Sequence, residues 1–218
     1  ISGGLKKMSK SQTIQQPATT FDQLWQVACQ SAERYRTTPQ SVFQAIGLRL
    51  ERPTHPWQYY CTPKNVKTFA STGIDGVHYS LLESEQLRYS PIVMTIPMSF
   101  DNANIIVAET LQEFLCLGCR ASYLRLELLA TCDADFSFLK SHYYAKNLSI
   151  PQVKLLQILS ERLSLYPLAT LSAKPSMRLE RRMAQLQAKY LDFLQMGERS
   201  PLPVKSVAPA AFSFGQFG

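Results

Sequence analysis

The chain has 218 residues, of which 45% are apolar and 18% are charged, and its formal net charge is +7. This balance is typical of a globular protein and excludes disordered and fibrous classes, and a chain of this length can bury a core without disulfides or metals. Because no apolar run approaches the roughly 20 residues of a membrane-spanning helix, the sequence predicts no membrane insertion.

The N-terminal residues and the cysteines indicate the compartment. Residues 1–7 lack the apolar block of a signal peptide and precede Met8, the expected natural start, so we interpret residues 1–20 as an added remnant and a flexible leader. The five cysteines are odd in number and lie in apolar runs, which is typical of reduced thiols. The sequence therefore predicts a cytoplasmic protein.

Two helices are predicted at the start of the folded part. Thr20 can cap a helix over residues 21–36 with Gln23 as its capping-box partner, and apolar residues follow at spacings of three and four. Thr38 before Pro39 repeats the start signal and predicts a second helix. The apolar stripe of that second helix would consist of Val42, Phe43, Ile46 and Leu50.

Strands are predicted from Trp57 onward, where aromatic and β-branched residues are punctuated by glycine and proline. In the third candidate strand, odd-numbered and even-numbered residues should face opposite sides of the sheet, with Tyr79 on one side and His78 on the other. Gly73 and the Asp75-Gly76 pair before it predict a turn with positive φ. The four candidate strands are residues 58–61, 66–70, 77–82 and 92–97.

Helical periodicity returns in the C-terminal half of the chain. It begins at residues 104–117 and continues at residues 121–130 and 134–146. Ser149 can cap a further helix, whose many leucines and isoleucines predict burial on more than one side. A last helix with one apolar side is predicted at residues 177–196.

These patterns predict an α+β fold. It would contain a short, twisted, mainly antiparallel sheet of about four strands, flanked by N-terminal helices, with an extra C-terminal helical part. The core domain would span residues 21–150, and a helical extension at residues 151–197 would pack on it. A Pro-rich, Phe-containing tail follows at residues 198–218.

The positive charge is concentrated toward the two ends of the chain. Residues 21–150 hold 11 basic and 12 acidic side chains, whereas residues 151–218 hold nine basic and four acidic ones. Two interpretations stay open for the basic helix near the C-terminus: a solvated helix face, or a surface that binds an acidic protein or nucleic acid. The side chains concerned are Lys174, Arg178, Arg181, Arg182 and Lys189.

One cysteine pair, Cys116 and Cys119, has the spacing of metal ligands. A zinc site needs four ligands, and only Cys61, Cys132 or His142 could complete this one. A redox dithiol and a pair of buried cysteines at a helix end are the alternatives. Because no second cysteine pair or paired histidines exist in the sequence, we expect no metal and no cofactor.

The turn before the third predicted strand is the most informative segment. Asp75 can accept a hydrogen bond from its own backbone or from His78, and Glu83 is near in sequence. These residues form either a ligand or partner site or a turn that only positions a hairpin. The sequence contains no recognisable nucleophile, zinc-protease or phosphate-binding motif, so we do not expect an enzyme.

Three segments together resemble the SUKH superfamily, which contains bacterial immunity proteins and relatives of fungal cell-wall regulators. They are residues 72–82 (TGIDGVHYSLL), 90–101 (SPIVMTIPMSFD) and 107–115 (VAETLQEFL), and the likeness covers roughly residues 66–118. The resemblance implies an α+β fold with a twisted sheet flanked by helices, and a role in binding rather than turnover. Many such proteins neutralise a toxin, frequently a nuclease, by covering its active surface.

The expected function is that of a non-enzymatic cytoplasmic protein-binding module, in an immunity or adaptor role, that occludes a toxin-like partner or joins a complex. A nucleic-acid-associated protein that uses the basic helix is one alternative, and a small enzyme that uses Asp75 and His78 is another. The expected contact residues are Asp75, His78, Tyr79 and Glu83, together with Phe212, Phe214 and Phe217 of the tail.

Overall fold

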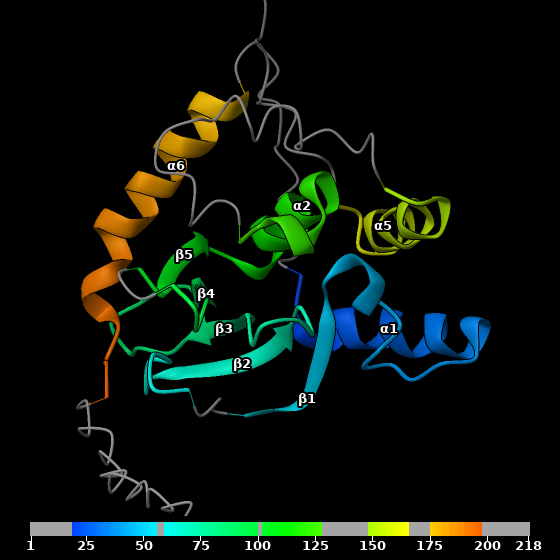
Figure 1. Cartoon of the computed structure of the whole chain (residues 1–218), viewed down its shortest axis with the longest axis horizontal. Helices are drawn as coiled ribbons and strands as arrows, with labels where there is room; N and C mark the ends of the chain where they lie inside the picture. Colours follow the sequence, from blue (N-terminus) through cyan, green and yellow to red (C-terminus); the bar gives the residue numbers. More distant parts are fainter. Residues whose placement is uncertain (1–18, 56–58, 100–101, 128–147, 166–174, 198–218) are drawn as a thin grey trace, which may run out of the picture.

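The computed structural model describes residues 19–55, 59–99, 102–127, 148–165 and 175–197, which form an α+β fold (Figure 1). Five antiparallel strands follow one another in the order β1-β2-β3-β4-β5, so each strand pairs with its neighbour in the chain. The predicted fold class is confirmed, with five strands rather than four. The strands are β1 (Arg49–His55), β2 (Val66–Ser71), β3 (His78–Leu82), β4 (Ile92–Thr95) and β5 (Asn104–Ala108).

Helices cover both faces of this sheet (Figure 1). Three of them contribute side chains to the larger core on one face: α1 (Phe21–Tyr35), α2 (Leu111–Ala121) and α5 (Ile150–Arg162). On the other face, α6 (Pro175–Tyr190) packs Leu186 and Tyr190 against the sheet. Within the described residues, no helix is long and apolar enough to cross a membrane.

Local capping signals place the starts of two helices as the sequence predicts. The Thr20 hydroxyl accepts a hydrogen bond from the Gln23 backbone N–H at 3.3 Å, and the Gln23 side chain accepts one from the Thr20 N–H at 2.9 Å. Ser149 and Gln152 form the same capping box at α5. Each box satisfies backbone donors that have no partner inside the helix.

The second predicted helix, after Pro39, is wrong. Its apolar residues are buried, but they lie in turns, in a single 3₁₀ turn over Gln44–Ile46 and in β1, which begins at Arg49. Gly47 adopts a left-handed conformation with φ 79°, where a helix cannot continue. Pro53 lies inside β1, which tolerates it because β1 is at the edge of the sheet.

Two further segments differ from the prediction. Residues 104–117 contain β5 and the start of α2 rather than one helix. The helix prediction is wrong there because β5 is buried along its whole length, so its sequence lacks the alternation of apolar and polar residues that marks a strand. Tyr59, Tyr60 and Cys61 lie in a turn region instead of a strand.

The C-terminal helices also correct the expectation in detail. α5 is buried on one side only, through Leu155, Leu156 and Leu159, while Ile150 is 74% exposed. α6 ends at Tyr190 and is followed by a 3₁₀ turn at Leu191–Phe193. Of the predicted helices at 121–130 and 134–146, the structure shows one 3₁₀ turn at Tyr123–Arg125. Residues 128–147 lie outside the described part of the chain.

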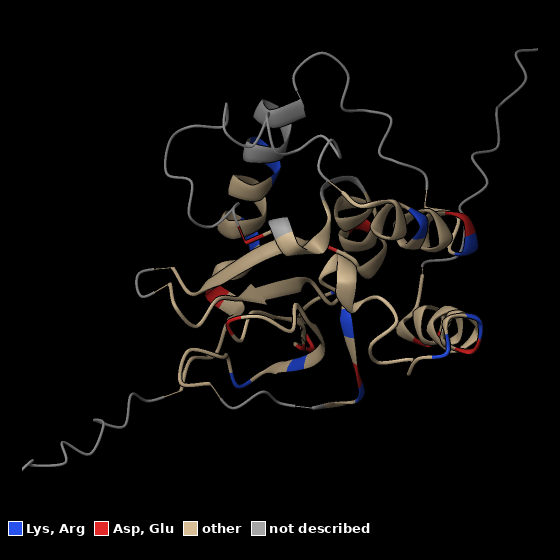
Figure 2. Cartoon of the chain, turned by 45° about the vertical axis from the view of Figure 1, so that its right-hand side comes forward, with Lys and Arg blue, Asp and Glu red and all other residues tan. Residues whose placement is uncertain are grey.

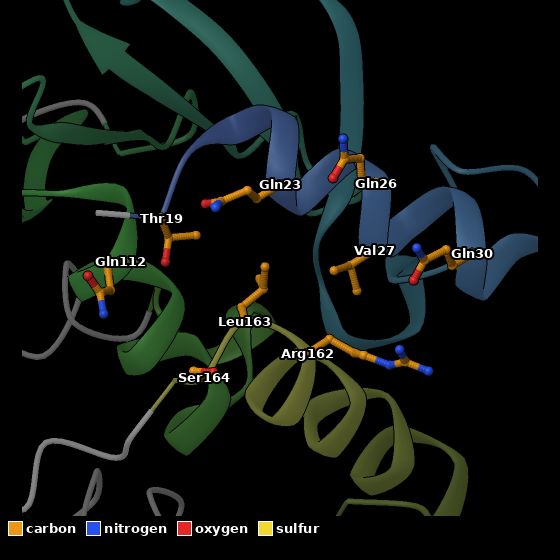
Figure 3. A pocket seen from close by; sticks show the side chains of 9 residues that line it. All are labelled: Thr19, Gln23, Gln26, Val27, Gln30, Gln112, Arg162, Leu163 and Ser164. Carbon is orange, nitrogen blue, oxygen red and sulfur yellow. The ribbon is translucent and has the colours of Figure 1, made fainter. Parts of the chain in front are cut away.

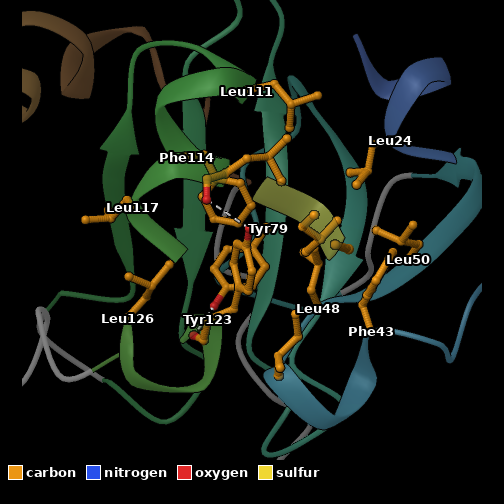
Figure 4. Close-up of a cluster of buried hydrophobic side chains, with 14 of the residues drawn as sticks. Leu24, Phe43, Leu48, Leu50, Tyr79, Leu111, Phe114, Leu117, Tyr123 and Leu126 are labelled. Carbon is orange, nitrogen blue, oxygen red and sulfur yellow. Dashed lines mark hydrogen bonds between the residues drawn. The ribbon is translucent and has the colours of Figure 1, made fainter. Parts of the chain in front are cut away.

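Aromatic side chains from β2, β3 and α2 meet at the centre of the larger core (Figure 4). Phe114 lies 4.8 Å from the ring of Tyr79, 5.2 Å from that of Tyr123 and 5.7 Å from that of Phe69, measured between centroids. The Tyr79 hydroxyl donates to the Tyr123 carbonyl at 2.7 Å, and the Tyr123 hydroxyl donates to the Leu115 carbonyl at 3.0 Å. These contacts fix the position of α2 on the sheet.

We expect Tyr79→Phe to lower the free energy of unfolding by about 1–2 kcal/mol, since the fully buried Tyr123 carbonyl loses its donor from Tyr79. Urea denaturation of the full chain measures this loss. Tyr89→Phe is the matched control, because Tyr89 is exposed and its hydroxyl makes no hydrogen bond among the described residues. Equal stability of Tyr79→Phe and the wild type would contradict the assigned role of this hydroxyl.

Candidate partner-binding surface

The turn between β2 and β3 is held by hydrogen bonds and places Gly73, Ile74 and Asp75 in solvent. The Thr72 hydroxyl donates to the Ile74 carbonyl at 2.9 Å and accepts from the Ile74 N–H at 3.2 Å. Gly73, Asp75 and Gly76 all have positive φ, as the sequence predicts, and aspartate is one of the few side chains that tolerate this conformation. The turn therefore holds Ile74 and Asp75 on the surface.

His78 and Tyr79 are not contact residues, because both side chains are 0% exposed. The Nδ1 of His78 is 2.8 Å from the Gly76 carbonyl oxygen, and its Nε2 is 3.2 Å from the Thr62 hydroxyl. Tyr79 belongs to the aromatic centre of the core, where burial raises the pKa of its hydroxyl. The predicted alternation is confirmed, since Tyr79 and His78 lie on opposite faces of the sheet, but both faces are covered.

Glu83 is exposed but does not share a surface with Asp75. It lies beyond the C-terminal end of β3, where it pairs with Lys67 at 2.7 Å, whereas Asp75 precedes the N-terminal end. The four predicted residues of the turn and strand thus do not form one site. Phe212, Phe214 and Phe217, predicted as further contacts, lie outside the described residues.

Instead, several large apolar side chains are exposed in the turns at the same end of the sheet as Asp75. Tyr60 and Met98 are each 68% exposed, Ile74 is 56% exposed, and Tyr59 lies beside them with about a third of its surface exposed. We call Tyr59, Tyr60, Ile74 and Met98 the apolar end surface, since they lie at the end of the sheet where β3 and β5 begin. Exposed apolar side chains that cluster in this way mark interaction sites more often than scattered ones do.

Backbone and ring contacts hold the apolar end surface together. The Tyr60 hydroxyl donates to the Pro97 carbonyl at 3.1 Å. A Cβ atom at Gly76 would lie 2.6 Å from the Tyr59 hydroxyl oxygen and 3.3 Å from Pro97 Cγ, so only glycine allows this close approach. The ring of Tyr59 also stacks on that of His78 at 5.8 Å, which explains the role of the buried histidine. The surface is therefore preorganised.

A cavity of about 380 Å³ adjoins this surface, between Tyr60 and the segment after α6. Leu191 and Met196 form its rim and are half-exposed, while Asn104 lies at its base. The Asn104 side chain donates to the Cys61 carbonyl at 2.8 Å and accepts from the Thr95 hydroxyl at 2.8 Å. Sequence reasoning missed this cavity because its lining comes from three segments that are far apart in the chain: residues 60–61, residues 99 and 102–104, and residues 191–197.

A second carboxylate, that of Glu127, lies near Asp75. Burial, and then the charge of Asp75, raise the pKa of Glu127 above its ordinary value. The chain as a whole carries a formal charge of +7, so these two carboxylates form an acidic spot on a basic protein. A partner with a basic side chain would complement it.

Two cations of the basic stripe on α6, Arg182 and Lys189, pair with carboxylates of the fold. Arg182 pairs with Glu113 at 2.8 Å and with Glu109 at 3.1 Å, and Lys189 pairs with Glu109 at 2.6 Å. Tyr190 also hydrogen-bonds to Glu109. Arg182 and Lys189 therefore tie α6 to the residues that follow β5 rather than forming a free patch.

Of the other three cations of this stripe, the structure describes the side chain of Arg181 only. Arg181 is exposed, and Lys174 and the side chain of Arg178 lie outside the described part of the chain. Figure 2 shows basic and acidic residues interspersed along α1 and α5. The structure thus removes two of the five side chains on which the nucleic-acid alternative depended.

The cysteine pair on α2 has the character of buried thiols. Burial raises the pKa of Cys119 to about 12 and also raises that of Cys116. A metal ligand or nucleophile has to be a thiolate, which this environment disfavours. Among the described residues, no three histidine, cysteine or acidic side chains gather into a metal site, and Cys132 and His142 lie outside them.

Comparison with known proteins identifies no relative of this chain. No family model matches the chain, and no curated protein or solved structure is detectably similar to it.

Proposed function

We propose that this chain is a non-enzymatic protein-binding module that covers a partner protein with its apolar end surface. The observation that carries the proposal is the clustering of four large, exposed apolar side chains on rigid turns at one end of the sheet. Aromatic side chains and methionine are enriched in protein interfaces. Asp75 and Glu127 supply a charged rim that would face a basic residue of the partner.

The resemblance of residues 66–118 to the SUKH superfamily makes neutralisation of a toxin the specific form of this proposal, with an adaptor role as the alternative. The described cysteines Cys29, Cys61 and Cys119 are free thiols, which supports a reducing, cytoplasmic setting. Occlusion needs no chemistry from this chain. His78, which an enzyme would have to present to a substrate, is instead used to support Tyr59.

The test is capture of the partner from the native host by the full chain and by the double variant Tyr60→Asp/Met98→Asp. Two anchors at the centre of an interface contribute about 2 kcal/mol or more each, so we expect affinity to fall more than 100-fold. Tyr35→Asp and Tyr89→Asp are the controls, because both are large apolar side chains exposed on other parts of the molecule, at 43% and 44%.

A stoichiometric companion that is lost only with the Tyr60/Met98 variant supports the proposal. A companion that the Tyr60/Met98 variant retains, or that the control variants lose equally, shows that binding uses another surface.

A further inference from the structure

A second hollow lies between α1 and the C-terminal end of α5 (Figure 3). Its main part has a volume of about 450 Å³, and a smaller cavity of about 120 Å³ continues it along α1. The two cavities share Val27, Gln30 and Arg162, so they form one elongated groove, which we call the α1–α5 groove.

The floor of the α1–α5 groove is apolar and its walls are polar. Val27 is buried at the bottom, and Leu163 points into the space from α5 (Figure 3). Four glutamines line the main part of the groove: Gln23, Gln26, Gln30 and Gln112. A concave site with an apolar floor and polar groups along its walls suits a ligand that carries both apolar atoms and hydrogen-bonding groups.

Several polar groups of the groove have no hydrogen-bond partner among the residues that the structure describes. Within the described residues, the side chains of Gln26, Gln30, Gln112 and Arg162 make no hydrogen bond or ion pair. The hydroxyl of Ser31, which lines the smaller cavity, also lacks a hydrogen bond among them although the residue is only 6% exposed. A buried polar group without a partner is costly, so this hydroxyl points to a ligand that supplies one.

The spacing of the glutamines matches the repeat of an extended peptide. Gln26 and Gln30 are four residues apart on α1, which separates them by about 6 Å along the helix axis. Two residues of an extended chain span about 6.6 Å. A carboxamide donates and accepts at once, so each glutamine can pair with the N–H and the C=O of one peptide residue.

The charge of the groove favours acidic side chains. Arg34 and Arg162 line it, and the only acidic residue with them is Glu161. One carboxylate oxygen of Glu161 already accepts a hydrogen bond from Gln157 at 2.7 Å. The guanidinium of Arg162 extends along the groove below Gln30 (Figure 3).

We propose that the α1–α5 groove binds an extended, acidic peptide segment of another protein. Gln26 and Gln30 pair with its main chain at every second residue, and Arg162 pairs with an acidic side chain. This site is separate from the apolar end surface, so neither proposal depends on the other.

The test is a ¹H–¹⁵N chemical-shift titration of the full chain with the peptide acetyl-(Ser-Asp)₄-amide. We expect saturable shifts at residues 23–31 and 158–164 and at the glutamine side-chain amides. The peptide acetyl-(Ser-Lys)₄-amide should give none. Two further probes carry N-methyl groups at every serine or at every aspartate, and one of the two should bind at least tenfold more weakly, because the glutamines meet only one set of main-chain amides.

Variants locate the binding groups. Gln26→Ala/Gln30→Ala should weaken binding of the (Ser-Asp)₄ peptide at least tenfold while α1 stays folded, since both side chains are exposed and alanine favours a helix. Arg162→Gln should weaken binding and reduce its dependence on salt. Gln86→Ala/Gln185→Ala, at two exposed glutamines elsewhere, is the matched control.

Three results would each overturn the proposal: no saturable shift at millimolar peptide, equal binding of both N-methylated peptides and the parent peptide, or equal loss in the control variant. Loss of binding in Tyr60→Asp/Met98→Asp but not in Gln26→Ala/Gln30→Ala would assign the peptide to the apolar end surface instead.

Discussion

Replacing Gly118 by alanine is expected to lower the free energy of unfolding by about 3 kcal/mol or more. A Cβ atom at this position would overlap the ring of Tyr123, which is itself fully buried and hydrogen-bonded through its hydroxyl to the Leu115 carbonyl. In an isolated helix the same change would stabilise by about 1 kcal/mol, so the tertiary contact reverses the sign. Urea or guanidinium denaturation measures the difference.

Gly197→Ala is the matched control for this substitution. The nearest atom to a Cβ at Gly197 is Lys64 Cε at 3.5 Å, an ordinary contact, and its φ is not in the left-handed region. We expect the control to stay within about 0.5 kcal/mol of the wild type. If Gly118→Ala is as stable as this control, α2 does not pack on Tyr123 as described.

The second large effect is expected at Glu109, which joins α6 to the end of β5. Glu109→Gln should cost about 2 kcal/mol, because the carboxylate accepts charged hydrogen bonds from Arg182 and Lys189 as well as one from Tyr190. The loss should concentrate in α6, whose Leu186 and Tyr190 cover one face of the sheet. Hydrogen exchange should therefore quicken along residues 181–190 and stay unchanged in α1.

Acid should remove this contribution in a defined range of pH. Hydrogen bonds from Lys189, Tyr190 and Arg182 lower the pKa of Glu109 from 4.5 to about 2, and the bond from Lys189 has the largest effect. A carboxyl whose pKa is lower in the folded state stabilises the fold above its unfolded pKa and loses this effect as the pH falls toward the folded value. The stability difference between wild type and Glu109→Gln should thus be constant above about pH 5 and shrink between pH 4.5 and 2.

Glu83→Gln is the control for both measurements at Glu109. Glu83 and Lys67 form an ion pair whose side chains are each about half-exposed, and such pairs contribute little because water screens them. A loss at Glu83 that equals the loss at Glu109, or a Glu109 difference that does not change with pH, would contradict the role given to Glu109.

The features that the sequence predicted well depend on neighbours within a few positions. Thr20 and Gln23 identify the start of α1 because a capping box is closed by residues three apart. Gly73 and Asp75-Gly76 identify the turn before β3 because positive φ is a property of single residues. The alternation of Tyr79 and His78 across β3 follows from the pleat of any strand.

The two strands that were missed are those in which tertiary burial overrides the local pattern. β5 is buried on both faces, so it lacks the polar alternation of a half-covered strand and was assigned to a helix. β1 contains Pro53, a residue that argues against a strand unless its position at the sheet edge is known. Neither fact can be obtained from a window of ten residues.

By itself, the sequence determined the α+β class, the caps of α1 and α5, and the turn that exposes Asp75, since backbone preferences act over three or four residues. The tertiary structure alone decided which side chains remain in solvent and which charges are paired. Tyr60 joins Pro97 and Met196, and Arg182 joins Glu109, across separations of 37 to 136 positions. Contacts at such separations arise only when the sheet and both helical layers have formed, so the candidate site had to be identified from the fold.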